Sequence, residues 1–384
     1  MLYDAVIVGA GPAGASCAAM LSKKGSKVLI IDRSIFPREK ACGGLISRKT
    51  IDFLTKEFDL QIDSNKIFKI NLRFSDDYYS SYKSDSPLAI VVRRRDFDNH
   101  LVELAQNFGA TFIHNCNYIN HEEQKQFCKV YTSKGSVYTR YLIGADGCFS
   151  SVAKKAFLRK KWSQWELGIA MSLLVPEEYI PSRDCEAVDF FFFKVLGGLG
   201  WCFPGKGFFN LGVGGWYLDS KNVIANFYSF MKSAINSEHK IEQFKINSAF
   251  LPAGGRARRI AKERVILIGD AAGLVDGFSG EGIFYAVQSA KIASETILNY
   301  LPGQVYQQNC YKHMIGEFRL SALVSILLGN RQIDKRLYRQ LCEGFCDILT
   351  GCEQSSYKKL LYGIILKTVS LKNPFLWAKR LFFD

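Results

Sequence analysis

The chain has 384 residues, 48% of them hydrophobic, and a formal net charge of +14. This length and composition allow a large buried core shared by two or three domains. Its apolar runs are much shorter than the ~20 residues of a transmembrane helix, and the first predicted strand, at Tyr3, leaves no room for a cleaved signal peptide. We therefore expect a cytoplasmic protein with reduced cysteines. The basic charge favours peripheral contact with an anionic membrane face over nucleic acid, and the alternative is a generally basic soluble protein without a specific surface role.

A strand–turn–helix–strand unit is predicted at the start of the chain. Its two apolar runs are YDAVIV and KVLII, and Gly9, Gly11 and Gly14 form a G-x-G-x-x-G turn between the first strand and the helix. Gly9 permits the tight turn, Gly11 lets the backbone approach a pyrophosphate, and Gly14 lets the helix pack closely on the strand. Asp32 ends the second strand, where its carboxylate can accept hydrogen bonds from a ribose. The dinucleotide contacts predicted here are Gly9, Gly11, Pro12, Ala13, Gly14, Asp32 and Arg33.

Later segments alternate between strand and helix patterns. Residues 66–92 favour strands and loops, and residues 96–108 have helical periodicity. From about 165 to 250 the pattern is mostly β, and its glycine turns indicate an antiparallel meander. Residues 264–299 return to a strand, a turn and a long helix, and the chain beyond 303 is predicted to be helical.

These patterns predict an α/β fold in three regions. A Rossmann-type nucleotide-binding domain is built from discontinuous segments, and it carries an antiparallel β-rich substrate domain and a helical C-terminal region. The chain has no internal repeat and no low-complexity tail, so these regions account for all of it. The nucleotide-binding domain is assigned residues 1–65, 90–155 and 262–300, the substrate domain 66–89 and 156–261, and the C-terminal region 301–384.

Two later segments indicate which dinucleotide is bound. In residues 265–283 an apolar strand brings Asp270 to the start of a helix rich in small residues, where a carboxylate can bind a ribityl hydroxyl. The amides of Ala271 to Gly273 and the helix dipole can face phosphate or the electron-rich edge of a flavin ring. The other segment is LIGADGCFSSV, which contains Asp146. Both segments suit an extended cofactor that runs from the first unit to a distant ring.

The order of these motifs resembles a large FAD-dependent family. That family includes para-hydroxybenzoate hydroxylase-type enzymes, halogenases and geranylgeranyl reductases, and its motifs match the glycine turn, Asp146–Gly147 and Gly269–Asp270. Ala153 departs from the family, because the Asp-Gly motif often continues into arginine there. The resemblance covers the chain to about residue 300.

A further match concerns the arginine that contacts FAD in this family. Arg94, followed by Phe97 and Asp98, resembles the R-x-x-F-D motif, although the neighbours Arg93 and Arg95 leave the assignment open by one residue. The FAD contacts that the resemblance implies beyond the first unit are Cys42, Gly43, Gly44, Arg94, Asp146, Gly269, Asp270, Gly280, Gly282 and Ile283.

Three stretches resemble the geranylgeranyl reductase branch of the family. PREKACGG, at 37–44, matches P-x-x-K-x-C-G-G, and GEGI, at 280–283, also fits. The meander contains Trp201, Phe203 and Pro204 of an aromatic-x-Trp-x-Phe-Pro element. Three positions depart from the branch: Leu199 replaces the first aromatic residue, Gly205 stands where lysine is common, and Gly277 stands where proline is usual.

This resemblance implies an FAD-dependent oxidoreductase that reduces C=C bonds of a prenyl, geranylgeranyl-type lipid by hydride transfer from reduced flavin. Cys42 is the expected catalytic residue, which donates the proton or covers one flavin face; the alternative is a small buried residue without a role. An apolar pocket is expected along Phe190–Phe193, and alternation along the strand turns about half of these side chains toward it, although ordinary sheet core explains the run equally well. The predicted substrate contacts are Phe191, Phe193, Trp201, Phe203 and Pro204.

The electron donor and two other functions stay open. No second dinucleotide fingerprint occurs, so we expect NAD(P)H bound transiently, or a reduced ferredoxin- or flavodoxin-type protein, as the donor. Residues 351–384 form a basic amphipathic end that lies on an anionic membrane or packs as an ordinary helix. The histidines lack metal-binding spacing, so no metal site is expected. The alternatives are an FAD-dependent aromatic monooxygenase or halogenase, whose W-x-W-x-I-P element here lacks its first Trp, and a flavin-binding membrane partner without turnover.

Overall fold

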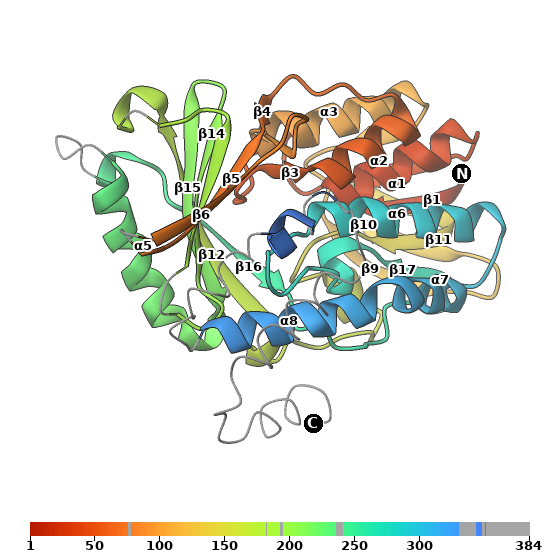
Figure 1. Ribbon diagram of the computed structural model, residues 1–384. Coiled ribbons are helices and arrows are strands. Elements are labelled where there is room, and N and C mark those ends of the chain that lie inside the picture. Colours follow the sequence, from red (N-terminus) through yellow and green to blue (C-terminus); the bar gives the residue numbers. More distant parts are fainter. Residues whose placement is uncertain are drawn as a thin grey trace.

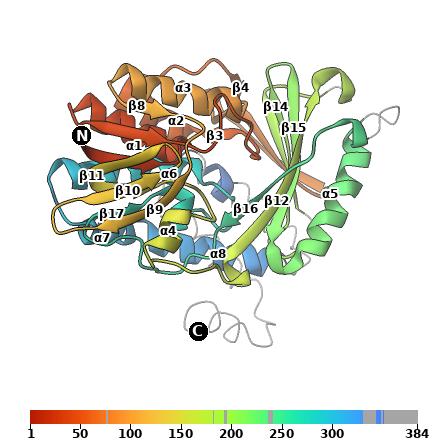
Figure 2. The ribbon, with the colours of Figure 1, turned by 180° about the vertical axis from the view of Figure 1, so that it is seen from behind.

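The computed structural model describes residues 1–75, 78–181, 183–192, 195–235, 241–329, 343–347 and 350. Two large sheets lie side by side in it. In Figure 1 the strands of the first sheet lie at the right among α1, α6 and α7, and the long strands β12, β14 and β15 stand at the left with α5 on their outer side. The view from behind in Figure 2 shows the same two parts, with α4 turned toward the viewer.

The first sheet has the order β8–β2–β1–β11–β10–β9, with β17 also paired to β11. Four neighbouring pairs are parallel: β8 with β2, β2 with β1, β1 with β11, and β11 with β17. The pairs of β11 with β10 and of β10 with β9 are antiparallel. Its strands are β1 (Leu2–Val8), β2 (Val28–Ile31), β8 (Thr111–Ile113), β9 (Tyr118–Glu123), β10 (Cys128–Thr132), β11 (Gly135–Gly144) and β17 (Val265–Leu267). Because these strands come from distant parts of the chain, the predicted assembly of a Rossmann-type sheet from discontinuous segments is confirmed.

Small side chains let the first helix pack in the centre of this part. α1 (Pro12–Lys23) is buried along nearly its whole length and contacts both α3 (Arg94–Asn107) and α6 (Ile283–Leu298). Residues such as Ala15, Ala18 and Ala19 allow neighbours to approach from every side. The other helices are α2 (Arg48–Phe58), α4 (Ser151–Lys155), α5 (Ser220–Ala234), α7 (Gly303–Cys310) and α8 (Gly316–Gly329), with a π-helical turn at Tyr311–Ile315.

The second sheet has the order β16–β12–β15–β14–β13–β5–β6. The predicted meander is present, because β13, β14 and β15 pair antiparallel in sequence order, while β5 joins β13 in parallel. α5 covers one face through contacts with β15 and β12. The strands are β5 (Lys69–Ser75), β6 (Tyr78–Lys83), β12 (Leu167–Pro176), β13 (Ala187–Phe192), β14 (Leu199–Gly205), β15 (Phe208–Trp216) and β16 (Asn247–Pro252). All of them fall within the segments assigned to the substrate domain.

A three-stranded sheet, β3–β7–β4, adjoins these two parts. Its strands are β3 (Leu45–Ser47), β4 (Asn65–Ile67) and β7 (Ala89–Val91). The C-terminal region is helical where the structure describes it, whereas the basic end predicted at 351–384 lies outside the described residues. Within the described part of the chain, no helix has the length and hydropathy needed to cross a bilayer.

Candidate FAD and substrate site

A cavity of about 540 Å³ lies between the first and second sheets. Its wall includes the glycine turn after β1, the segment between β2 and β3, the loop after β11, the loop before α6, and parts of β12 to β16. Motifs that are far apart in the sequence therefore meet around one space. The predicted residues that line it are Gly9, Gly11, Pro12, Ala13, Asp32, Arg33, Cys42, Gly43, Gly44, Arg94, Asp146, Trp201, Phe203, Asp270, Gly280, Gly282 and Ile283.

The three fingerprint glycines act in different ways. Gly9 has φ +104°, and a Cβ there would lie 2.3 Å from the Ala145 carbonyl oxygen. A Cβ at Gly14 would lie 1.9 Å from the Gly9 oxygen, so Gly14 permits close packing and does not itself line the cavity. Gly11 faces the cavity, and the nearest atom to its added Cβ is Arg38 Nη2 at 3.5 Å. Only Gly11 therefore keeps space open for a ligand.

Asp32 shapes the same turn. Its buried carboxylate accepts hydrogen bonds from the backbone nitrogens of Ala10 and Ser34, each at 2.8 Å. A carboxylate oxygen has two lone pairs, so each oxygen can accept one further bond from a ligand hydroxyl. Asp32 thus orders the turn and still offers acceptors at the cavity wall.

Asp146 also has a structural task. Its carboxylate accepts hydrogen bonds from Ser150 Oγ (2.5 Å) and from the backbone nitrogens of Ser151 (2.7 Å) and Val152 (3.2 Å), at the start of α4. Burial raises the pKa of Asp146, and these hydrogen bonds oppose that rise. The Asp-Gly motif therefore fixes the position of α4 beside the cavity.

Asp270 differs because its carboxylate makes no hydrogen bond with the residues that the structure describes. It follows β17 and lines the cavity, and burial raises its pKa while the positive charges of Lys40 and Arg94 lower it. An acceptor without protein donors is suited to a ligand hydroxyl. The preceding Gly269 does not line the cavity; an added Cβ there would lie 3.0 Å from the Cβ of Ala13, so this glycine permits packing.

Of the three consecutive arginines, the middle one faces the cavity. Arg94 donates two hydrogen bonds to the buried Asp98 carboxylate, at 2.7 and 2.8 Å, and Arg38 adds an ion pair to Asp98 at 3.2 Å. Arg93 and Arg95 are exposed. Burial lowers the pKa of Arg94, but the interactions with Asp98 and Cys42 raise it by more. The net pKa lies above its usual value, so the guanidinium stays charged.

The cysteine segment packs against the second sheet through its glycines. Cys42 Sγ accepts a hydrogen bond from the Gly44 nitrogen at 3.4 Å, and the Arg94 side chain contacts the same thiol. A Cβ on Gly43 would lie 2.9 Å from the Phe203 ring, and one on Gly44, where φ is +75°, would lie 2.3 Å from the Val92 oxygen. The two glycines therefore allow the thiol to lie between a cation and an aromatic wall.

A residue that the sequence analysis did not select holds this contact together. Asn210 Nδ2 donates to the Cys42 carbonyl at 2.8 Å, and Asn210 Oδ1 accepts from Trp201 Nε1 at 2.9 Å. The signal in the sequence is a lone amide within the apolar run FFNLGV, which becomes informative only when its partners are known. Asn210 thereby fixes Trp201 relative to the cysteine segment.

The aromatic wall matches the predicted contacts at Trp201 and Phe203 but not at Phe191 and Pro204. Phe190, Trp201 and Phe203 line the cavity, whereas Phe191 points to the opposite face, where its ring packs 4.6 Å from that of Phe230 on α5. Phe191 and Pro204 are not part of the wall, because side chains alternate along a strand and the inward positions are those of Phe190 on β13 and of Trp201 and Phe203 on β14. The predicted contact Phe193 lies outside the described residues.

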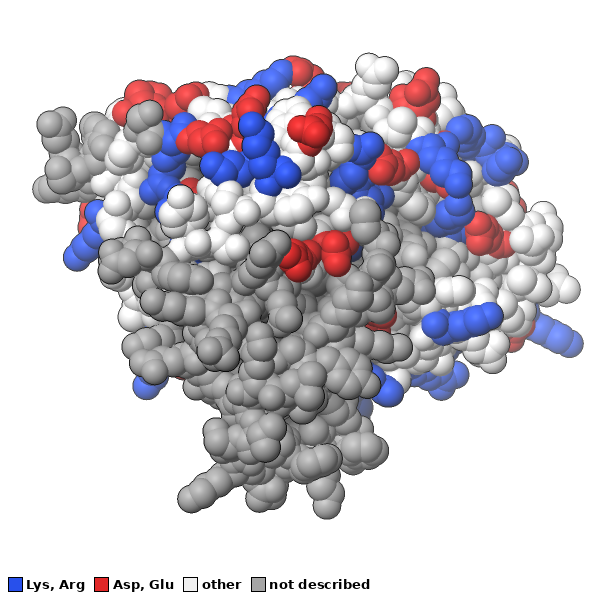
Figure 3. All heavy atoms as spheres, viewed as in Figure 1, with Lys and Arg blue, Asp and Glu red and all other residues white. Residues whose placement is uncertain are grey.

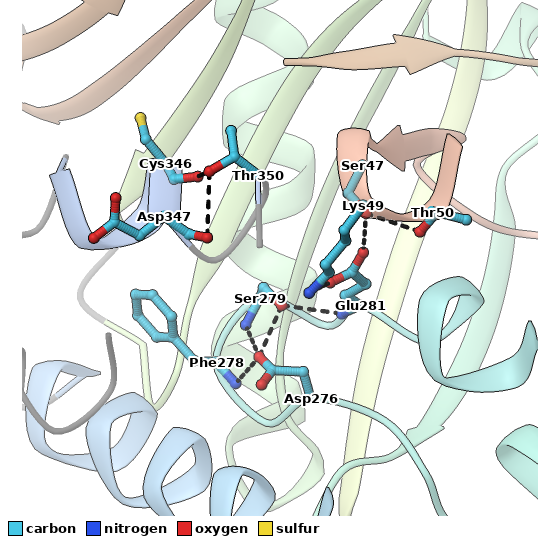
Figure 4. Close-up of polar contacts among 10 residues, drawn as sticks. All are labelled: Ser47, Lys49, Thr50, Asp276, Phe278, Ser279, Glu281, Cys346, Asp347 and Thr350. Atoms are coloured by element: carbon cyan, nitrogen blue, oxygen red, sulfur yellow. Dashed lines mark hydrogen bonds and ion pairs between the residues drawn. The ribbon is translucent and has the colours of Figure 1, made fainter. Parts of the chain in front are cut away.

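The loop before α6 is ordered by two carboxylates, of which Asp276 is buried and Glu281 is partly buried (Figure 4). One oxygen of Asp276 accepts from the backbone nitrogen of Ser279 and from Ser279 Oγ, both at 2.7 Å. Glu281 accepts from Ser47 Oγ at 2.5 Å and pairs with Lys49 Nζ at 2.6 Å. Gly280, Gly282 and Ile283 are thereby held at the cavity wall, where the amino-terminal end of α6 faces the cavity.

Contacts around Gly277 explain why proline is absent at that position. The Gly277 nitrogen donates to Ser321 Oγ at 2.9 Å, and an added Cβ would lie 2.9 Å from the Ala253 oxygen. Proline would remove this donor and would add bulk at a close contact. The departure from the branch pattern therefore reflects tight packing of the loop against α8.

Comparison with known sequences gives both a family and named relatives. Residues 2–309 match the model of the FAD binding domain family. The chain is 30% identical over 319 residues to menaquinone reductase of Mycolicibacterium smegmatis, covering 76% of this chain and 75% of that protein. It is 27% identical to digeranylgeranylglycerophospholipid reductase of Methanocaldococcus jannaschii, covering 97% of each chain. The expected resemblance to the geranylgeranyl reductase family is confirmed.

Solved structures share the fold. A geranylgeranyl bacteriochlorophyll reductase-like protein of Thermoplasma acidophilum superposes with a TM-score of 0.77 at 20% identity, covering 96% of this chain and 99% of that one. A flavin-dependent brominase superposes with a TM-score of 0.68 at 18% identity, covering 97% and 100%. At these identities the comparisons establish the architecture.

The residues around the cavity fit an extended FAD. Gly11 leaves room for a pyrophosphate at the start of α1, Asp32 and Asp270 offer carboxylate acceptors, and the start of α6 faces the same space. Arg94, held by Asp98, adds a fixed positive charge beside Cys42 at the cavity wall. Donors and acceptors thus match both the phosphate and the polyol parts of the cofactor.

Proposed function

The chain belongs to the FAD binding domain family, and on that premise we propose that it is an FAD-dependent oxidoreductase that reduces C=C bonds of a prenyl lipid of geranylgeranyl type. The observation that carries the proposal is the continuity of one cavity, in which the glycine turn and Cys42 share a wall with Phe190, Trp201 and Phe203. The relatives described above are named menaquinone reductase and digeranylgeranylglycerophospholipid reductase, and the second name, which specifies a geranylgeranyl lipid, supports this substrate class.

Reduction of an isolated alkene needs a hydride for one carbon and a proton for the other. Bound FAD in its reduced form supplies the hydride. Cys42 Sγ–H gives its proton to the second carbon, and the resulting thiolate is stabilised by the charge of Arg94, which Asp98 holds in place. The thiol regains a proton from solvent before the next turnover, so atoms and charge balance.

The protein's other contribution is position. An unactivated double bond reacts only when its carbons are held close to the hydride donor, so the pocket must fix a flexible chain. The side chains available for this are apolar and mutually packed: Phe190 contacts Phe203 and Phe345 at ring distances of 5.1 and 4.5 Å, and Phe278 contacts Phe345 at 5.6 Å. Such a wall suits a prenyl chain and offers it no charged partner.

Electron supply and membrane contact complete the proposal. The donor is NAD(P)H bound transiently, or a reduced ferredoxin- or flavodoxin-type protein, because the sequence has one dinucleotide fingerprint, the glycine turn after β1, and we assign that turn to FAD. Access to a lipid substrate requires peripheral contact with a membrane. In the coloured part of Figure 3, Lys and Arg are interleaved with Asp and Glu, so the described residues seen there form no uniformly basic patch.

The test uses purified protein with its flavin photoreduced under anaerobic conditions, which removes the question of the donor. Incubation with a geranylgeranyl lipid should raise the lipid's mass by two units for each double bond reduced, with reoxidation of an equivalent amount of flavin. Unchanged lipid mass would contradict the proposal. Rapid NADPH oxidation with oxygen uptake and a hydroxylated or halogenated product on addition of an aromatic compound would favour the alternative instead.

A further inference from the structure

The segment from Phe149 to Lys161 has one face packed on the protein and one face that is basic and aromatic. We propose that this basic–aromatic segment docks the protein on an anionic lipid bilayer. It contains α4 and lies on the side of the molecule shown in Figure 2, near β9 and β16. The sequence between these residues, FSSVAKKAFLRKK, has no acidic residue. The inference rests on the proposed function only for the route of the lipid substrate.

Phe157 is the most unusual residue of the segment. Its side chain is 81% exposed, the highest value among the large apolar side chains that the structure describes. Its φ is +55°, a left-handed backbone that is unfavourable for a bulky residue. Phe157 N donates to the Lys154 oxygen at 3.2 Å and Leu158 N to the Ala153 oxygen at 3.0 Å, which is the helix-ending motif that normally has glycine at this position. The chain thus holds an aromatic ring in water where glycine would be more stable.

Four exposed lysines flank Phe157 in the sequence. Lys154, Lys155, Lys160 and Lys161 are all exposed, and none of them makes an ion pair within the part of the chain that the structure describes. Lysine is depleted at protein–protein interfaces, whereas lysines around an exposed aromatic side chain are typical of segments that lie at the headgroup level of anionic membranes. Charge and apolar area therefore favour a bilayer over a protein partner.

The inward face of the segment is firmly anchored. Val152, Ala153, Ala156 and Leu158 are buried. Arg159 donates to the Ala271 oxygen at 2.8 Å, and its guanidinium lies 3.7 Å from the centre of the Trp162 ring. The exposed ring and lysines are thus presented on a fixed support that is bonded directly to the loop after Asp270.

The segment begins at the cavity. Phe149 lines the cavity and is 64% exposed, so it lies at an opening, and its ring packs 5.2 Å from that of Phe250, which also lines the cavity. Tyr217 extends this aromatic contact at 5.4 Å from Phe250. Docking through Phe157 and the lysines therefore places an aromatic opening of the cavity near the bilayer surface, where a prenyl chain can enter without crossing water.

Binding to vesicles tests the docking surface without substrate or reductant. The full chain is mixed with vesicles of equal parts phosphatidylglycerol and phosphatidylcholine, and with pure phosphatidylcholine, and bound protein is measured by sedimentation. We expect binding to the anionic vesicles only. Gln at all four lysines should weaken it on the order of 600-fold, since each lysine near an anionic surface contributes roughly 5-fold. Four exposed lysines elsewhere, Lys56, Lys66, Lys83 and Lys125, changed together to Gln provide a control with the same net charge.

Phe157→Gly separates binding from folding, because glycine suits the left-handed backbone. We expect vesicle binding to fall about 10-fold while the melting temperature stays the same or rises. Tyr300→Gly is the matched control: Tyr300 is 72% exposed, has φ +54° and ends α6 in the same motif, so it should lose no binding. The proposal is overturned if wild type ignores anionic vesicles or if the Phe157 and four-lysine variants bind like their controls. Loss of turnover only with a reduced donor protein would instead assign the segment to that protein.

A parallel assay keeps this proposal separate from the proposed function. Photoreduced wild type and the four-lysine variant are given a geranylgeranyl substrate dispersed in detergent. Equal reduction by both, with weaker vesicle binding by the variant, supports the docking surface. Binding without any reduction would leave the docking surface standing and would contradict the proposed reaction.

Discussion

Cys42 has a free thiol at the cavity wall, beside the guanidinium of Arg94. This position predicts that replacing the thiol slows alkene reduction. Cys42→Ser should keep stoichiometric FAD but lower the rate of alkene reduction about 100-fold, because a serine hydroxyl is a much weaker proton donor. The measurement is single-turnover reoxidation of photoreduced protein by the lipid. Cys116, which also lines the cavity, provides the control Cys116→Ser, whose rate should stay near wild type. Equal rates in the two variants would remove the catalytic role of Cys42.

We expect Asp270 to lower the stability of the flavin-free protein and to strengthen the binding of FAD. Burial raises its pKa, so keeping the carboxylate ionised costs folding free energy. Asp270→Asn removes this cost and should raise the melting temperature of the flavin-free protein by about 2 °C. The same change should weaken FAD binding about 10-fold, because an ionised acceptor is lost. Fluorescence titration with FAD and calorimetry of the apoprotein measure the two effects, and a fall in both quantities would show that Asp270 is mainly structural.

Residues in glycine and carboxylate motifs could be selected from the sequence more easily than the direction in which the side chains of a strand point. The glycines, Asp32, Asp270 and Cys42 could be selected from sequence because local backbone constraints and motif spacing identify them. The choice between Phe190 and Phe191 depends on which face of β13 meets the cavity, and a shift of one residue reverses every side chain of a strand. Asn210 could not be found, because its role lies in two partners, Trp201 and Cys42, that come from other elements.

At the scale of elements, the glycine turn and α1 allow packing to be separated from ligand binding. Gly14→Ala should destabilise the protein by about 3 kcal/mol or more, since the new Cβ would lie 1.9 Å from the Gly9 oxygen. Gly11 has an extended backbone that alanine can adopt, and its new Cβ would meet Arg38 at 3.5 Å. Gly11→Ala should therefore leave the apoprotein's melting temperature unchanged within ~2 °C.

The two variants should differ in FAD binding as well. The methyl group of Gly11→Ala occupies space that a pyrophosphate needs, at a cost of about 1–3 kcal/mol, or ~5- to 150-fold in Kd. Thermal unfolding with and without added FAD measures both quantities in one experiment. A Gly11→Ala protein that gains as much thermal stability from FAD as wild type would contradict the placement of the cofactor at this turn.

The positions of helices and strands with strong hydrophobic periodicity were predicted correctly from the sequence. The pairing of strands from distant parts of the chain was not predicted. The helix expected at 96–108 is α3, Arg94–Asn107, and the meander strands β13, β14 and β15 lie where glycine turns divide them. The parallel pairing of β5 with β13 joins segments more than a hundred residues apart, and no local pattern determines such a contact. The short strands β3, β4 and β7 likewise depend on tertiary packing for their existence.

At the scale of the whole molecule, a buried histidine predicts how stability depends on pH. His121 lies on β9, and its Nδ1 is 2.6 Å from the hydroxyl of Tyr118. Tyr118 lines the cavity. Burial lowers the pKa of His121 below its usual 6.5. The folded protein therefore favours the neutral ring, while the unfolded chain binds a proton at higher pH.

The sign follows from proton uptake. Above pH 6.5 both states hold a neutral ring and the stability is complete; as the pH falls below 6.5 toward the lower pKa of the folded state, the unfolded chain takes up the extra proton and stability is lost. The free energy of unfolding should fall by up to ~1.4 kcal/mol per pH unit in this window. Urea unfolding is measured between about pH 7.5 and pH 5, which brackets the usual pKa of histidine. Wild type should lose stability as the pH falls, and so should the control His100→Gln, because His100 is exposed. His121→Gln should lose less. Identical slopes in all three proteins would place the pH dependence in other groups and would remove His121 from this account.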